Sequence, residues 1–134
     1  MRYRYLTLAM TLISLAVVAL SGTVVGSTDE PTEAGAMLVE GQRAFNDGDF
    51  RQALDRWDRA ADAYRERGEA AAQAQALVGK GMAYLALGRF PRAGAAMAEA
   101  RELAAGAGDR ALAMRAAIGQ GSAQALSGNP DGAK

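Results

Sequence analysis

Apolar residues along most of the chain recur every three or four positions, the spacing of one face of an α-helix. A first such segment begins near Thr32 and is interrupted at Gly48. A second runs from Asp49 to Gly68, and the same pattern then follows twice more. Gly, which weakens helices, marks each interruption. The pattern predicts an all-α fold built from helix–turn–helix units.

Capping signals support these helix boundaries. Thr32 follows a proline and is a plausible N-cap, and Asp49 and Gln52 have the spacing of a capping box. Pro91 lies in the first turn of a predicted helix, where its missing N–H costs nothing, and Asp109 is a predicted N-cap.

The helical pattern repeats at an offset of 40 residues. Glycines, alanines and large apolar residues coincide in two or three copies at Gly41/Gly81/Gly121, Gly48/Gly88/Gly128, Phe50/Phe90/Pro130, Ala53/Ala93/Ala133, Leu38/Val78/Ile118, Trp57/Met97 and Ala60/Ala100. One hairpin cannot bury its apolar face alone, so consecutive hairpins must stack. We divide this region into units 34–69, 74–109 and an incomplete 114–134. The third unit either caps the stack with a lone helix or belongs to a longer array.

The small residues of the repeat predict where helices approach closely. Two helices come within about 8 Å where no bulky side chain intervenes. We therefore expect Gly41, Ala53 and Ala60, with their copies, at the helix contacts. Large residues such as Trp57 and Met97 are expected to fill the space beside them.

The stretches GQRAFNDGDFRQALDRWDRAADAY and GKGMAYLALGRFPRAGAAMAEARELA resemble tetratricopeptide repeats. The forty-residue period, with AGAGDRALAMRAAIGQG joining two units, is similar to the subtype with longer loops. The resemblance covers residues 34–134 and implies helical hairpins stacked as a short right-handed α-solenoid. Such motifs are specific to fold and nearly silent about function.

The resemblance also implies a groove, formed by the first helices of the units, that binds extended peptides or partner helices. Some relatives hold the partner's terminal carboxylate with Lys, Arg and Asn, but Leu38 and Gln42 at the matching positions argue against such a clamp. By position, the groove would include Gln42, Phe45, Asn46, Gln75, Met82, Leu85, Arg115 and Ser122.

The N-terminal segment has the pattern of an export signal. Arg2 and Arg4 are followed by 24 uncharged residues, from Tyr5 to Thr28. Residues 1–26 are either a cleaved signal peptide or an uncleaved anchor helix through residues 6–26, since such a run can span about 30 Å of hydrocarbon. Residues 27–33 form a linker. Both alternatives place the rest outside the cytoplasmic membrane, in the periplasm or extracellular space.

Composition excludes several kinds of chemistry. The chain has no Cys and no His, which removes thiol and imidazole catalysis, disulfides and the usual zinc sites. Fifteen basic and fifteen acidic residues give no electrostatic support for nucleic-acid binding. Asp47 and Asp49 lack calcium-loop spacing and are not repeated, whereas Gly48 is, so this stretch predicts a turn.

Two further candidates are also better explained structurally. Asp55, Asp58 and Asp62 share one helix face with interleaved arginines and predict a solvated surface. The GKG stretch at 79–81 lacks the strand and full spacing of a phosphate loop. We predict no catalytic residue, no metal and no cofactor.

These observations favour an exported, non-catalytic scaffold that binds a protein or peptide. Two alternatives remain open: the N-terminal repeat segment of a larger exported enzyme or sensor, and a membrane-tethered assembly factor. Membrane contact is expected only through an uncleaved N-terminal segment. The open end of the repeat array is a candidate for self-association.

Overall fold

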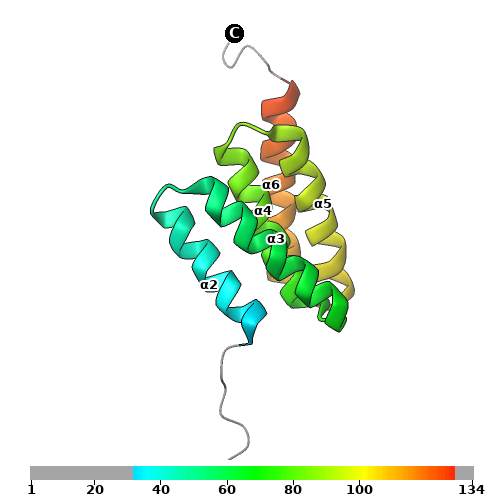
Figure 1. Cartoon of the computed structure of the whole chain (residues 1–134). Coiled ribbons are helices and arrows are strands. Elements are labelled where there is room, and N and C mark those ends of the chain that lie inside the picture. The colour runs from blue at the N-terminus through cyan, green and yellow to red at the C-terminus, as the bar shows by residue number, and fades with distance from the viewer. Residues whose placement is uncertain (1–31, 129–134) are drawn as a thin grey trace, which may run out of the picture. The chain divides into compact units, whose positions relative to one another are not determined.

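Five α-helices follow one another in the computed structural model, which describes residues 32–128. They are α2 (Glu33–Asn46), α3 (Phe50–Arg67), α4 (Ala70–Ala86), α5 (Phe90–Gly106) and α6 (Arg110–Gly128). Each packs against the next as an antiparallel neighbour (Figure 1). The prediction of an all-α fold made of helical hairpins is confirmed.

Some predictions fall outside the described residues. The signal or anchor segment 1–26, most of the linker 27–33 and the last six residues of the third unit are among them. Within residues 32–128, no helix is both long enough and apolar enough to cross a bilayer.

The predicted N-caps are confirmed. Thr32, Asp49 and Asp109 each accept a hydrogen bond through a side-chain oxygen from the backbone N–H three residues later, at 3.1, 3.1 and 3.0 Å. Each bond satisfies one of the donors that a helix start leaves without a partner. Pro91 lies in the first turn of α5, as predicted.

All four turns between the helices have the same geometry. At the first, the Gly48 N–H donates to the Phe45 carbonyl at 3.1 Å and the Asp49 N–H donates to the Ala44 carbonyl at 2.9 Å. This pair of bonds is a Schellman motif, which requires a left-handed residue, and Gly48 has φ +82°. Equivalent bonds close the turns at Gly68, Gly88 and Gly108.

These turns correct two expectations. The Asp49 N–H is already bonded to Ala44, so Gln52 does not complete the capping box. The segment joining the second and third units is not a long loop, because the turn at Gly108 leads directly into α6. The extra length of the forty-residue period therefore lies in helices of 17 to 19 residues over α4, α5 and α6.

The core consists mainly of alanine. Of twenty buried apolar residues, fourteen are Ala, and the six larger ones are Trp57, Tyr64, Leu77, Val78, Met97 and Leu112. Ala53, Ala60 and their copies Ala93 and Ala100 are fully buried, as expected for helix contacts. Because small side chains dominate, the helices lie close together and few side chains provide the bulk of the core.

Trp57 lies between two glycines of different helices. A Cβ on Gly41 of α2 would lie 2.6 Å from the indole Nε1, and one on Gly79 of α4 would lie 2.5 Å from Cδ2. The indole N–H also donates to the Leu38 carbonyl at 3.2 Å. Any larger residue at either glycine would overlap the ring.

Met97 occupies the equivalent place one unit later. A Cβ on Gly81 of α4 or on Gly119 of α6 would lie 2.7 or 2.6 Å from the Met97 methyl carbon. Each large residue of a second helix is thus held between the first helices of its own and the next unit.

We expect Gly79→Ala to lower the free energy of unfolding by about 1 kcal/mol or more. Overlap with the rigid indole costs about 1–3 kcal/mol, which outweighs the gain of about 1 kcal/mol from the higher helix propensity of Ala. Urea denaturation of the purified chain, followed by circular dichroism, measures the change.

Gly106→Ala is the matched control, because Gly106 is helical and a Cβ there meets no atom within 4 Å. It should leave stability unchanged or slightly raised. Equal losses for the two variants would contradict the proposed role of the glycine at Trp57.

Candidate functional site

The first helices of the three units, α2, α4 and α6, lie in a row along one surface. α4 contacts both α2 and α6, whereas α3 and α5 do not contact each other. A stack in which alternate helices lie closer together curves toward those helices. The surface of α2, α4 and α6 is therefore where a groove is expected.

A groove of about 350 Å³ lies on this surface. Three helices and the edge of Trp57 form it, and its lining is Gly35, Leu38, Val39, Gln42, Trp57, Gln75, Val78, Gly79, Met82 and Arg115. Half of the predicted groove residues are among them: Gln42, Gln75, Met82 and Arg115.

The lining combines apolar side chains with a few polar groups. Val39 and Met82 are 60% and 37% exposed, which is high for large apolar residues. Two amides, Gln42 and Gln75, and the guanidinium of Arg115 provide the hydrogen-bonding groups. An amide side chain both donates and accepts, and a guanidinium recognises carboxylates.

The other four predicted residues lie outside this lining. Phe45 is half-buried and packs on the rings of Phe50 and Trp57, at centroid distances of 5.1 and 5.7 Å, so it belongs to the contact between α2 and α3.

Asn46 accepts a hydrogen bond from the Gln42 side chain at 2.9 Å. Ser122 donates to the Ile118 carbonyl of its own helix at 3.1 Å, and Leu85 is half-buried. Contact of these three residues, or of Phe45, with a partner stays a prediction.

Six lining residues were not assigned to the groove from the sequence: Gly35, Leu38, Val39, Trp57, Val78 and Gly79. The sequence feature that could have placed Val39 in the groove is its position: it is apolar, but it lies beside the apolar stripe of its helix and not on it. Gly35 and Gly79 also line the groove, and their only signal is a glycine within a helical pattern. That signal cannot be separated from helix packing, and Gly79 does contact Trp57.

A second depression continues the groove between α4 and α6. It is lined by Ala71, Ala72, Gln75, Asp109, Ala111, Leu112 and Arg115, so Gln75 and Arg115 border both hollows. The Asp109 carboxylate also caps α6. Arg115 makes no ion pair with any residue between 32 and 128, which leaves its guanidinium available to a ligand.

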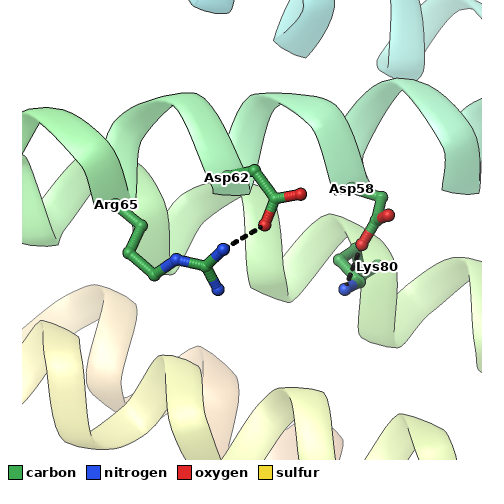
Figure 2. Close-up of polar contacts among 4 residues, drawn as sticks. All are labelled: Asp58, Asp62, Arg65 and Lys80. Atoms are coloured by element: carbon green, nitrogen blue, oxygen red, sulfur yellow. Dashed lines mark hydrogen bonds and ion pairs between the residues drawn. The ribbon is translucent and has the colours of Figure 1, made fainter.

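The acidic face of α3 is a set of ion pairs on the surface. Asp55 pairs with Arg59 at 3.3 Å and Asp62 with Arg65 at 2.9 Å, while Asp58 pairs across the helix contact with Lys80 of α4 (Figure 2). All three carboxylates are more than half exposed. This arrangement fits the predicted solvated surface. In the part of the chain that the structure describes, no group of three metal-ligating side chains occurs.

The sequence matches no family model, no curated protein and no solved structure. The structure shows an all-helical domain of five sequentially packed helices, and its likeness to tetratricopeptide repeats rests on the repeat positions alone.

Asp58→Asn should lower stability more than Asp62→Asn. The Lys80 side chain is only 18% exposed, so loss of Asp58 leaves a partly buried ammonium without its partner, at a cost of about 0.5–1 kcal/mol. The exposed pair of Asp62 and Arg65 is worth about 0.3 kcal/mol or less.

Urea denaturation of both variants at low and high salt measures this difference. Both losses should shrink at high salt, and the loss for Asp62→Asn should shrink by the larger fraction, because salt screens exposed charges more than partly buried ones. A larger loss for Asp62→Asn would contradict this ranking.

Proposed function

We propose that this domain is a non-catalytic interaction module of the tetratricopeptide type that binds an extended peptide of a partner protein. In this proposal the hairpins form a short right-handed solenoid, with α2, α4 and α6 on its inner side. The repeat of Gly and Ala positions at 40 residues and the contact of α4 with both α2 and α6 support it.

The mixed lining of the groove is the observation that carries this function. Apolar positions from α2 and α4 suit the alternating side chains of an extended peptide. Gln42 of α2 and Gln75 of α4 both line the groove and can bond the N–H and C=O groups that an extended peptide leaves free. The backbone N–H and C=O groups inside the helices are already bonded to each other. Side-chain amides are therefore the groups suited to bond the backbone of the peptide.

Arg115 defines the chemistry of the peptide further. It is the one charged residue that lines the groove between α2 and α4, and it makes no ion pair with residues 32–128. A guanidinium binds a carboxylate through two parallel hydrogen bonds. The preferred ligand is therefore an apolar peptide with a carboxylate, from an acidic side chain or a C-terminus, at the α6 end of the groove.

The location of the partner follows from the N-terminal sequence. Two arginines followed by 24 uncharged residues favour export, whether the segment is cleaved or retained as an anchor. The partner would then be a protein of the periplasm, the extracellular space or the outer side of the membrane.

Selection from a peptide display library tests this function directly. We expect apolar peptides with a carboxylate to be selected by the purified chain. Arg115→Ala should weaken their binding about fivefold, which corresponds to about 1 kcal/mol for a solvent-exposed charged hydrogen bond. Fluorescence anisotropy of a labelled peptide measures the dissociation constant.

Arg101→Ala is the matched control, because Arg101 is an exposed arginine of α5, which contributes nothing to the groove. It should leave binding unchanged. Selected peptides whose affinity is equally insensitive to Arg115→Ala and Arg101→Ala, or a selection that yields no binder, would rule out the groove as the peptide site.

A further inference from the structure

α6 exposes an apolar stripe on the side facing away from α4 and α5. Met114 and Ile118 are 67% and 66% exposed, Ala125 is exposed, and a Cβ on Gly121 would meet no atom within 4 Å. These four residues are spaced four, three and four apart, so they lie on one helix face. We call them the α6 stripe.

The α6 stripe corresponds to residues that are covered in the other units. Forty positions earlier, in α4, stand Ala74, Val78, Gly81 and Leu85, and Ala74 and Val78 are 0% and 4% exposed. There Met97 of the following helix rests on Gly81.

The equivalent residues of α2 are Ala34, Leu38, Gly41 and Phe45, and Trp57 of the following helix packs on Gly41. In α2 and α4, the residues equivalent to the α6 stripe are thus the surface against which the second helix of the hairpin packs. Within residues 32–128, no helix covers it on α6 (Figure 1).

We propose that the α6 stripe is a dimerisation surface, on which α6 packs antiparallel to α6 of a second copy of the chain. In an antiparallel pair whose two-fold axis passes between Ile118 and Gly121, Met114 lies opposite Ala125 and Ile118 lies opposite Gly121. Two-fold symmetry forms each of these pairs twice. A large residue then rests on a small one throughout, as Trp57 rests on Gly41 inside the fold.

Charge selects the antiparallel orientation. Between residues 110 and 128 the only charged residues are Arg110 and Arg115, both near the start of the helix. A parallel pair would place these cations beside their copies, which is unfavourable. An antiparallel pair brings them toward the C-terminal end of the partner helix, where the helix dipole is negative. None of the four stripe residues lines the groove, so the dimer does not rest on the proposed peptide binding, although Arg115 enters both proposals.

Cysteine cross-linking tests the interface and its direction together, because the chain has no native cysteine. Met114→Cys and Ala125→Cys replace exposed residues, so both full-length variants should fold. Mixed under mild oxidation, they should give a disulfide-linked dimer between the two variants, with far less from either variant alone. Mass spectrometry identifies the linked peptides, so association through the N-terminal segment is not mistaken for this contact.

Ile118→Lys, added to both cysteine variants, should lower the yield at least about tenfold, since it places an unpaired charge in the contact. Ala95→Lys is the control, because Ala95 is exposed on α5 and is not part of the α6 stripe. It should leave the yield unchanged.

Ala95→Cys and Ala105→Cys, both exposed on α5, report random collisions. A mixed yield no higher than that of this α5 pair would overturn the proposal. Cross-linking of each variant with itself in preference to the mixture would also overturn it, because it indicates a parallel pair.

Discussion

Two large side chains, each between two glycines, determine how closely the helices pack. Trp57 and Met97 both belong to a second helix and both contact first helices on either side through positions without a Cβ. An alanine-rich helix has little apolar volume of its own, so stability depends on close approach and on the few bulky groups. The glycines permit that approach, and the indole and thioether fill the space that remains.

The turns impose a second constraint on the same contacts. Four Schellman turns, each with a left-handed glycine, separate the helices at intervals of twenty residues. Turns of the same geometry at equal spacing keep each Gly in register with the large residue it faces. A turn of another length would rotate the following helix and move Gly79 away from Trp57, since one residue corresponds to about 100° of helix rotation.

The groove follows from this packing and not from a separate constellation of residues. Trp57 borders it because the ring lies between α2 and α4, and Gly79 borders it because no side chain covers the ring there. The site therefore has an apolar floor fixed by the core and polar groups, Gln42, Gln75 and Arg115, placed around it. The ion pairs of α3 lie apart from the groove, since none of their residues lines it.

The sequence by itself determined the helices, their caps at Thr32, Asp49 and Asp109, and the pairing of Gly41 and Gly81 with large residues. These features are local or periodic, so spacing and residue type reveal them. Only the tertiary structure decided that Gly79 and Gly119 complete those contacts, that Phe45 packs against rings of α3, and that Ile118 is exposed where Leu38 and Val78 are covered. Such features depend on which helix lies opposite, and residue spacing within one helix does not contain that information.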